Sequence, residues 1–437
     1  MQDGSVDVRW DFGGMPKFAQ STARYAVGIS HVRGENVIRA ALIRVLGRGH
    51  QMVCDPIRGA YAALPDEAIG MLARNTEELK FSPSDFSFWQ ADLADRCAQL
   101  ANPLIGRARH DFVEPLVVAV DGIAIAPTQS QDTPRSISLC DSGCLAASTG
   151  ITVVDDFSAA DVVHGGSGGP VMGMADWILF GDRSGIPGQR NRGVLRLGPS
   201  VRVSIVPSRG TRADPPEIVC IDGGPGYELL GRVRDTVLGG NAFDSKLAVQ
   251  ANVVHSIVDE WCNRLSDFRR SRSTSEDHSE DHSQVVETLV ADLERRQDQS
   301  SITPAQWMMT ATEFLARLVA DAVHDCTPKS MPIFELVLTG EMHLDGLLQN
   351  RLGRFLPGIT IRSGAMTEST CSTDAVAIAV MGLLRIDNAI GNSTRQTGTA
   401  KPRSLGRLTP GRPSNWNRVL LEMATAMRES MTLKTAV

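Results

Sequence analysis

The sequence lacks an excess of positive charge, which proteins that bind nucleic acid or anionic lipid usually gather on one face. Its 44 lysines and arginines are outnumbered by 50 aspartates and glutamates, and the formal net charge is −6 at pH 7. It also lacks any run of about 18 apolar residues, the length that a membrane-spanning helix requires. We therefore expect neither a nucleic acid nor a membrane among its partners.

Signals for export and for metal binding are missing as well. Residues 1–24 contain no apolar stretch of the kind that a signal peptide needs. The cysteines are scattered, and the close pair Cys140 and Cys144 has no second Cys or His pair to complete a zinc site. We interpret both as small buried residues, predict no metal-ligating residues, and expect a reducing, cytoplasmic location.

The length and the composition are those of a globular protein with two lobes. At 437 residues the chain exceeds the size of about 250 to 300 residues at which a single hydrophobic core stops growing. Hydrophobic residues make up 42% and charged residues 22%, as in ordinary globular proteins. We therefore expect two lobes rather than one small domain.

The order of apolar patterns predicts an α/β protein. Residues 25–30 and 37–45 are apolar runs on either side of a polar turn, which predicts an antiparallel hairpin. The nearly continuous apolar run at 115–126 predicts a strand buried on both faces. Further along the chain, predicted strands alternate with helices, including those at 227–238 and 373–386. This alternation indicates a mixed sheet in each lobe.

A glycine-rich segment, DFSAADVVHGGSGGP at 156–170, follows a predicted strand. Its first residue, Asp156, ends that strand beside a flexible loop, where a carboxylate can face a ligand and act as a base. The alternative is that Asp155, Asp156 or Asp161 caps the turn or helix that follows. The glycines that come next allow the backbone to approach a sugar or phosphate closely.

A second glycine-rich segment, DGGPG at 222–226, joins a predicted strand to the predicted helix at 227–238. A strand, a tight turn and a helix N-terminus in this order direct backbone N–H groups toward an anion. This arrangement favours phosphate binding. An ordinary connection between strand and helix stays open as the alternative.

Two other segments have unusual composition. Residues 266–284 are dense in charge, poor in apolar residues and contain a tandem SEDH repeat, so we predict a disordered insertion. His278 and His282 have a spacing that could bind a metal on a helix, but a solvated acidic tract is the better interpretation. The segment 388–415 is rich in Gly, Pro, Arg and Thr and is predicted to be irregular.

Several of these segments resemble the anhydro-N-acetylmuramic acid kinase family, sugar kinases of the actin-like superfamily, and its fungal members in particular. The central motif of that family is similar to TGITVVDDFSAADVVHGGSGGPV at 149–171, and its phosphate motif to DGGPGY at 222–227. DAVAIA at 374–379 and RQTGTAKPRSLGRLTPG at 395–411 resemble two later motifs. All four occur in the order that the family has.

The resemblance implies a two-lobed, actin-like (ribonuclease H-like) α/β fold with a cleft between the lobes. On this basis we expect a flexible N-terminus at 1–22, lobe I at 23–137 joined by 387–437, and lobe II at 138–386. The family phosphorylates 1,6-anhydro-N-acetylmuramic acid with ATP and Mg²⁺ and opens the anhydro bond by adding water, a reaction of amino-sugar catabolism and cell-wall sugar recycling. The expected partners are thus an amino sugar and a nucleotide, and the sequence leaves open whether the chain forms a homodimer.

The resemblance also assigns roles to residues of this chain. It places Asp156 as the catalytic base that accepts a proton from the attacking water. The residues assigned to the sugar are Gly165, Gly166, Ser167, Gly168 and Asp374. The residues assigned to the phosphates of ATP are Asp222, Gly223, Gly224, Pro225, Gly226 and Gly340.

The sequence departs from the family pattern where ATP is expected to bind. Asn36 replaces an aspartate of the first hairpin, and a neutral amide binds Mg²⁺ less well than a carboxylate. Pro199 replaces a glycine, Glu341 places a negative charge near the nucleotide, and Asp121 is the one carboxylate at the end of its strand. Two functions therefore stay open: a phosphotransferase with an alcohol group as acceptor, or a pseudokinase that binds a sugar, nucleotide or protein partner without catalysis.

Overall fold

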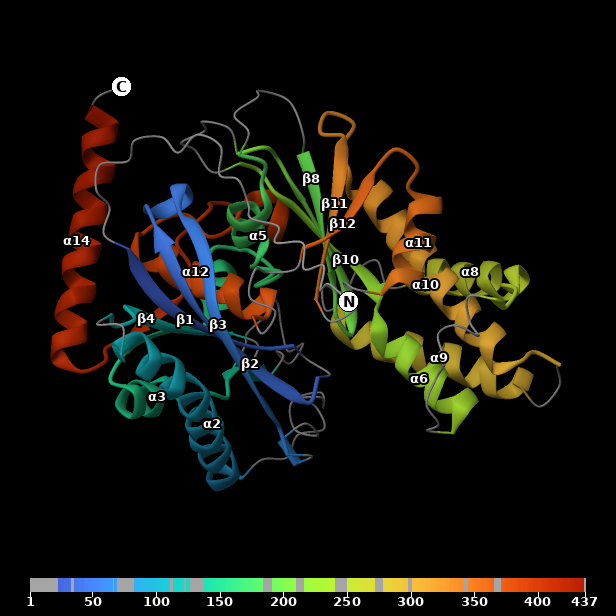
Figure 1. The fold of residues 1–437 in the computed structure, drawn as a ribbon, viewed down its shortest axis with the longest axis horizontal. Coiled ribbons are helices and arrows are strands. Elements are labelled where there is room, and N and C mark those ends of the chain that lie inside the picture. Colours follow the sequence, from blue (N-terminus) through green and yellow to red (C-terminus); the bar gives the residue numbers. More distant parts are fainter. Residues whose placement is uncertain are drawn as a thin grey trace, which may run out of the picture.

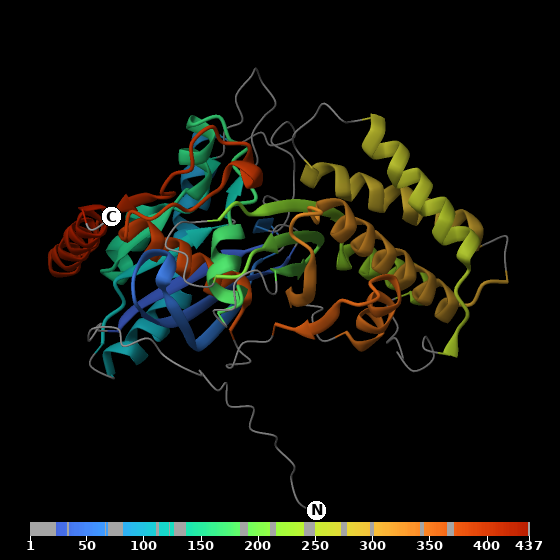
Figure 2. The same ribbon diagram turned by 90° about the horizontal axis from the view of Figure 1, so that it is seen from above.

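Two lobes, each built around a mixed β-sheet, form the protein in a computed structural model (Figures 1 and 2). The N-terminal segment 1–22, which was expected to be flexible, lies outside the residues that the structure describes. The described residues are 23–32, 35–65, 67–68, 82–110, 113–121, 123–125, 137–183, 191–209, 216–239, 250–271, 278–297, 301–340, 345–364 and 371–435.

The sheet of lobe I has three antiparallel strands followed by two parallel ones, and a short antiparallel strand at its edge. Its strands lie in the order β13 (Arg407–Thr409), β7 (Thr152–Asp155), β4 (Val117–Asp121), β1 (Arg24–His31), β2 (Val37–Leu46) and β3 (Val53–Ala63). β1, β2 and β3 are antiparallel, whereas β4 and β7 run parallel to β1. The predicted hairpin is confirmed, and so is the central, buried position of β4.

The sheet of lobe II repeats this topology. Its order is β10 (Val219–Pro225), β9 (Ser200–Val206), β8 (Asn191–Leu197), β11 (Ile333–Gly340) and β12 (Thr360–Ser363). β8, β9 and β10 are antiparallel, and β11 and β12 are parallel to β8. Because each lobe has the ribonuclease H-like order of an antiparallel meander followed by parallel strands, the predicted two-lobed α/β fold is confirmed.

Helices cover both faces of the lobe I sheet. α2 (Pro83–His110) and α3 (Ser142–Thr149) pack on one face, while α5 (Gly173–Phe180) and α12 (Thr373–Ile386) pack on the other. Alternate residues of β1 point to opposite faces, so Val27 and Ile29 join the α2 side and Ala26 joins the α12 side. At Gly28, a Cβ atom would lie 1.9 Å from the carbonyl oxygen of Ala375, so only glycine lets α12 lie this close to β1.

Within the part of the chain that the structure describes, five helices enclose the core of lobe II. They are α6 (Tyr227–Leu238), α8 (His255–Ser271), α9 (His278–Gln297), α10 (Pro304–Cys326) and α11 (Gly346–Phe355). The ring of Trp261 stacks on that of Trp307 at 6.3 Å between centroids and meets Phe314 edge-on at 5.5 Å. α10 begins with a capping box in which Thr303 and Gln306 satisfy each other's free backbone N–H groups.

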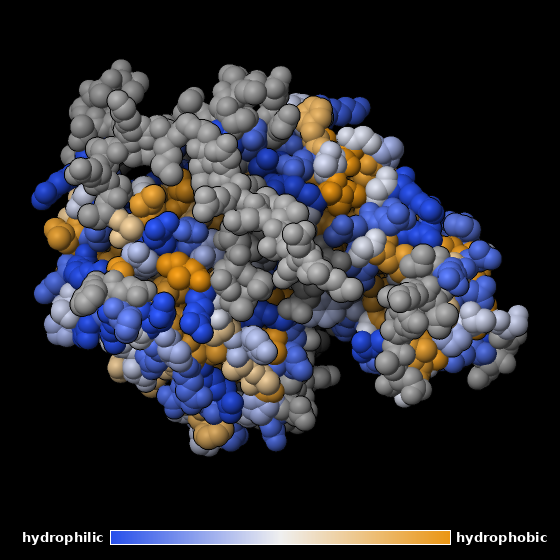
Figure 3. All heavy atoms as spheres, viewed as in Figure 1, coloured by the Kyte–Doolittle hydropathy of each residue, from blue (hydrophilic) through white to orange (hydrophobic). Residues whose placement is uncertain are grey.

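The two lobes share one continuous apolar core. α5 and α12 lie between the sheets and contact apolar residues of both, including Ala41 of β2, Val194 of β8 and Val337 of β11. In the space-filling view the surface is hollowed between the lobes on the side where α6 lies (Figure 3). Within the described residues, no helix is both long and apolar enough to cross a membrane.

The expected division into lobes is wrong at residue 138. β7 pairs with β4 through the register of Val153 with Val118, and α12 packs on β1, so both elements belong to lobe I rather than lobe II. Lobe II therefore begins near β8 and ends near β12. Strand pairing depends on long-range register, which a reading along the chain does not contain.

The expected disorder at 266–284 is also wrong for the residues described there. Residues 266–271 end α8 and residues 278–284 begin α9, while 272–277 lie outside the described part. The polar start of α9 leads directly into Val285, Val286 and Leu289, which pack into the lobe II core and anchor the helix.

The segment 388–415, predicted to be irregular, contains two short elements. α13 (Thr394–Thr397) is a single helical turn, and β13 pairs with β7 at the edge of the lobe I sheet. A long helix that the sequence analysis did not anticipate, α14 (Pro413–Thr435), follows and runs along the outside of lobe I (Figure 1). The smaller elements are η1 (Gly49–Gln51), β5 (Ala124–Ile125), β6 (Ile137–Ser138) and α4 (Phe157–Val163).

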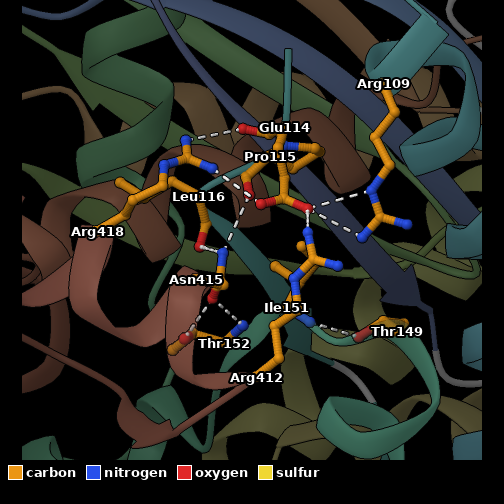
Figure 4. Close-up of polar contacts among 10 residues, drawn as sticks. All are labelled: Arg109, Glu114, Pro115, Leu116, Thr149, Ile151, Thr152, Arg412, Asn415 and Arg418. Carbon is orange, nitrogen blue, oxygen red and sulfur yellow. Dashed lines mark hydrogen bonds and ion pairs between the residues drawn. The ribbon is translucent and has the colours of Figure 1, made fainter. Parts of the chain in front are cut away.

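Asn415 attaches α14 to the sheet. Its Oδ1 accepts hydrogen bonds from the backbone N and from Oγ1 of Thr152, both at 2.7 Å, and its Nδ2 donates to the carbonyl oxygens of Pro115 and Leu116 (Figure 4). The side chain is fully buried. One amide therefore satisfies backbone groups at the start of two adjacent strands, β4 and β7.

We expect Asn415→Leu to lower the free energy of unfolding by about 3 kcal/mol, because buried N–H and C=O groups would lose their partners. Urea denaturation of the variant and the wild type measures this difference. Asn417→Leu is the matched control, since Asn417 is exposed on the same helix and its loss should cost little. Equal stability of the two variants would contradict the prediction.

Candidate functional site

Asp156 lies at the junction of β7 and α4. Its backbone is left-handed, with φ 52° and ψ 56°, and its Oδ1 accepts a hydrogen bond from the backbone N of Ala159 at 3.3 Å. The side chain thus caps α4, as the structural alternative proposed. A positive φ at a residue other than glycine is uncommon and costs energy, and such strain is concentrated at functional sites. Capping and a chemical role are compatible here.

A cavity of about 630 Å³ opens beside Asp156. Its volume is within the range of about 300 to 1,000 Å³ found for small-molecule sites. It lies among α2, β6, the start of α3, the end of β7 and β13, and most of the residues that line it have polar side chains. The lining residues are Phe86, Gln90, Ser138, Cys140, Asp141, Ser142, Asp156, Arg407 and Thr409.

The carboxylates of this cavity differ in their environments. Burial raises the pKa of Asp156, although the charge of Arg407 and the N–H of Ala159 oppose the shift. The backbone N–H of Cys144, together with that of Gly143, lowers the pKa of Asp141, which caps α3. A pair of carboxyl groups with opposite shifts is typical of sites that move protons. Asp156 is the one better suited to accept a proton.

Arg407 is a cation in the cavity wall, but it is already paired. Its Nη2 and Nε donate to the two carboxylate oxygens of Asp155 at 2.6 and 3.2 Å. This pair of hydrogen bonds joins β13 to β7. It also compensates the charge of Asp155, which is buried and would otherwise be unpaired. Sequence analysis missed the role of Arg407, and the only signal was its place in the segment 395–411 that resembles a family motif.

The glycine-rich loop after α4 is tied to the segment 392–399 by Asp161. The fully buried Asp161 accepts hydrogen bonds from the backbone N of Gly168 at 2.9 Å and from Oγ1 of Thr397 at 2.6 Å. A Cβ at Gly166 would lie 2.0 Å from Oδ2 of Asp161, so glycine is required there for packing. Gly165, Gly166, Ser167 and Gly168 do not line the cavity beside Asp156, and their role toward the sugar stays a prediction.

The predicted phosphate residues gather around the turn between β8 and β9. The backbone N of Gly226 donates to the carbonyl oxygen of Pro199 at 2.6 Å, and that of Tyr227 donates to Gly198 at 2.9 Å. At the end of β11, Gly340 pairs with Leu197 and has a positive φ of 86°. The segment 222–226 and Gly340 therefore lie on either side of one hairpin turn, and their role toward phosphate stays a prediction.

The helix N-terminus at this point is partly occupied by the protein itself. Gly226 and Tyr227 use their N–H groups on the β8–β9 turn, so these two donors do not face an open anion site. Asp222 accepts hydrogen bonds at its Oδ1 from the backbone N of Gly224 at 3.0 Å and from Nε2 of His282 at 2.7 Å. Burial alone would raise the pKa of Asp222, but His282, Gly224 and Arg202 together lower it.

A hydrogen bond connects the two lobes beside these turns. The hydroxyl of Tyr227 donates to Oε1 of Glu35 at 3.0 Å, and Arg39 pairs with the other oxygen of that buried carboxylate. Glu35 precedes Asn36, where the family has an aspartate, so a carboxylate is present in the first hairpin one residue earlier than expected. Sequence analysis missed Glu35 and Tyr227, although an acid next to Asn36 was a visible signal.

The hairpin and Asp156 lie at the same edge of the lobe I sheet. β1 leads into the hairpin and β7 leads into Asp156, and both run parallel to β4, which lies between them. Neighbouring strands are about 4.8 Å apart, so the two strand ends are separated by about 10 Å. This spacing is small enough for one sugar–nucleotide pair to contact both.

Asp374 lies in a buried ion cluster between the lobes. Arg196 of β8 pairs with Asp374 at the start of α12 and with Asp176 of α5, and Oγ of Ser204 donates to Asp176 at 2.9 Å. Burial raises the pKa of Asp176 in spite of these partners. The predicted substrate residue Asp374 is therefore engaged by an arginine, and its role toward the sugar stays a prediction.

The described residues contain no group of three His, Cys, Asp or Glu side chains that could hold a metal ion. Cys140 is buried as predicted, whereas Cys144 is exposed, so that prediction is wrong for Cys144. Glu341 lies outside the described residues.

Mg²⁺ usually binds through one or two carboxylates together with phosphates and waters. Of the two carboxylates at these turns, Asp222 could serve in this way, whereas both oxygens of Glu35 are already engaged by Tyr227 and Arg39.

Comparison with known proteins shows a match to the sequence model described as anhydro-N-acetylmuramic acid kinase over residues 81–411. A relative of that name from Synechococcus sp. is 29% identical over 329 residues, covering 74% of this chain and 83% of its own. Another from Gloeobacter violaceus is 26% identical over 397 residues, covering 88% and 98%. Among solved structures, the activator of the 2-hydroxyisocaproyl-CoA dehydratase from Clostridium difficile with bound ADPNP superimposes with a TM-score of 0.38 at 11% identity. The match covers 82% of this chain and 94% of that one.

The family match spans most of the chain and includes Asp156 and both glycine-rich segments. The relatives are aligned over most of their own lengths as well. The chain belongs to the anhydro-N-acetylmuramic acid kinase family.

Proposed function

We propose that the protein is an ATP-dependent kinase that opens and phosphorylates 1,6-anhydro-N-acetylmuramic acid. The observation that carries this proposal is the strained Asp156, which occupies the position of the family's base and lines a cavity large enough for a sugar. Family membership supports the reaction type and the substrate class. Use of ATP and Mg²⁺ is part of the proposal.

In this reaction water adds to the anomeric carbon, the anhydro C–O bond breaks, and the released oxygen receives the phosphoryl group. ATP with Mg²⁺ would supply that group from its γ-position, and ADP would leave as the bond between its β- and γ-phosphates breaks. Asp156 accepts the proton that the attacking water loses, which requires its carboxylate to be ionised. The half-buried position of Asp156 makes it a stronger base than an exposed aspartate, because burial disfavours the charged form.

The remaining cavity side chains bind and orient the sugar. Gln90, Ser138 and Ser142 offer amide and hydroxyl groups, which suit hydroxyl and acetamido substituents. Arg407, held by Asp155, keeps a positive charge near Asp156 and favours its ionised state at neutral pH. The site thus shields Asp156 partly from water, while Arg407 limits the rise in its pKa.

A pseudokinase that binds a ligand without turnover is the second candidate. The specific observation in its favour is the set of internal hydrogen bonds at the phosphate end: Gly226 and Tyr227 donate to the β8–β9 turn, and Tyr227 also bonds the buried Glu35. A negative charge beside the phosphates opposes their binding. The two candidates differ in whether Mg·ATP binds and turns over.

Asp156→Asn should reduce kcat by about 10²- to 10⁴-fold, because the proton acceptor is lost. Its free energy of unfolding should equal or exceed that of the wild type, since asparagine tolerates a positive φ and carries no half-buried charge. A coupled assay with the anhydro sugar and a thermal melt measure both quantities. Asp235→Asn, at an exposed position, is the control. Unchanged turnover in Asp156→Asn would exclude the proposed base.

The wild type should melt at a higher temperature in millimolar Mg·ATP, because a ligand bound by the native state stabilises it. Glu35→Gln should tighten ATP binding by about three- to tenfold, since it removes a negative charge from the phosphate turns while its carbonyl still accepts from Tyr227. Glu294→Gln, exposed on α9, is the matched control. If Mg·ATP changes the melting temperature of none of these proteins, the kinase proposal is overturned and the pseudokinase is favoured.

The pH profile should carry the signature of Asp156. Activity requires the ionised carboxylate, and its pKa is raised, so kcat/KM should rise with pH along an acid limb above the usual aspartate value of about 4. Because the folded-state pKa is raised, the contribution of Asp156 to stability falls as pH rises between its unfolded and folded pKa values. Asp156→Asn should remove that fall. An acid limb at or below about pH 4 would contradict the assignment.

A further inference from the structure

His282 contacts the phosphate turn of lobe II from an unexpected part of the chain. It lies in the first turns of α9, within the SEDH repeat, and its Nε2 is 2.7 Å from Oδ1 of Asp222. The imidazole is mostly buried, with 12% of its side chain exposed. A contact this short between a ring nitrogen and a carboxylate is a charge-assisted hydrogen bond when the ring is protonated.

The same carboxylate oxygen organises the turn. Oδ1 of Asp222 also accepts from the backbone N of Gly224 at 3.0 Å, and the register of β10 with β9 shifts between these two residues. Gly224 has a positive φ of 112°, which other residues rarely adopt. The position of the Asp222 carboxylate therefore determines the path of the backbone through the DGGPG segment.

The second oxygen of Asp222 is left available. Among the described residues, Oδ2 has no hydrogen-bond partner, while Oδ1 is shared by His282 and Gly224. The side chain of Asp222 keeps 20% of its surface exposed, so a ligand can reach it. A carboxylate held at one oxygen can present the other in a fixed direction.

α9 is rigid enough to hold such a contact. Three residues after His282, Val285 and Val286 enter the lobe II core, and Leu289 follows one turn later. Glu287 of α9 pairs with Arg232 of α6 at 2.7 Å, so α9 is also fixed against the helix that the DGGPG turn begins. The histidine is therefore attached to the same packed unit as the turn.

The charges around His282 come from three other elements. Asp222 on β10 and Glu228 on α6 are carboxylates that face it, and burial raises the pKa of Glu228. The positive charge of Arg202 on β9 lowers the pKa of Asp222. Glu287, a further carboxylate, lies on α9 itself. The hydrogen bond with Nε2 of His282 holds the Asp222 carboxylate in place among these charges.

We propose that His282 is a positioning residue that orients Asp222 and the DGGPG turn for the phosphates of the nucleotide. This proposal rests on the proposed kinase function for its ligand, but not for its geometry. It assigns a role in the site to a segment whose composition suggests a solvated tract.

The test compares His282→Leu, which removes the donor, with His282→Gln, whose side-chain amide can still donate to Asp222. His282→Leu should raise the KM for ATP about tenfold with kcat changed less than twofold, because an interaction with a charged group is lost at the binding turn. His282→Gln should restore KM to within about threefold of the wild type. His255→Leu, an exposed histidine on α8, is the matched control and should change neither value.

A second measurement does not require ATP to bind. In the ligand-free protein, hydrogen exchange at the Gly224 amide should be at least about tenfold faster in His282→Leu than in the wild type, because its acceptor Asp222 is no longer held. If the wild type neither binds nor turns over ATP, the kinase function fails, while faster exchange at Gly224 still supports the positioning role. Unchanged exchange at Gly224, or a lower melting temperature with unchanged KM for ATP, overturns it.

Discussion

The contact between β1 and α12 is the constraint on which the rest of the molecule depends. Gly28 has no side chain, so the backbone of α12 reaches the central strand of lobe I, and a single added carbon would meet the carbonyl oxygen of Ala375. α12 in turn carries the apolar residues that join both sheets into one core, and its first turn carries Asp374, which pairs with Arg196 of lobe II. Packing this close leaves little freedom, because protein interiors are filled to crystal-like density and strain is transmitted through them.

The two ends of the candidate site are built on different physical principles. Around Asp156, a raised pKa, a paired arginine and a cavity lined mainly by polar side chains suit the proton acceptor and the sugar pocket that we propose. At the turns around the β8–β9 hairpin, both carboxylates are engaged by the protein itself: Glu35 pairs with Arg39, and Asp222 accepts a hydrogen bond from His282. Catalysis of phosphoryl transfer relies on positive charge near the phosphates. The proposed sugar end of the site therefore provides more of the chemistry that its role needs than the proposed nucleotide end does.

The sequence patterns predicted the elements whose periodicity is strong. The hairpin of β1 and β2, the buried strand β4, and the helices α6 and α12 were all expected at nearly the residues where they occur. β13 was not, because three residues form a strand only when the edge of β7 is there to pair with them. α9 was mistaken for disorder because its polar first turns are stabilised by apolar residues that follow them, and α14 was missed because the side chain that anchors it, Asn415, is polar.

By itself the sequence determined the family, the α/β class, and the two glycine-rich segments with Asp156 at the end of a strand, since these follow from short-range order and periodicity. Only the tertiary structure decided which lobe holds β7, that Arg407 neutralises Asp155, that Tyr227 reaches Glu35 across the lobes, and that His282 holds Asp222. Each of these depends on residues far apart in the chain. Their distances are set by sheet register and helix packing, and local composition carries no record of either.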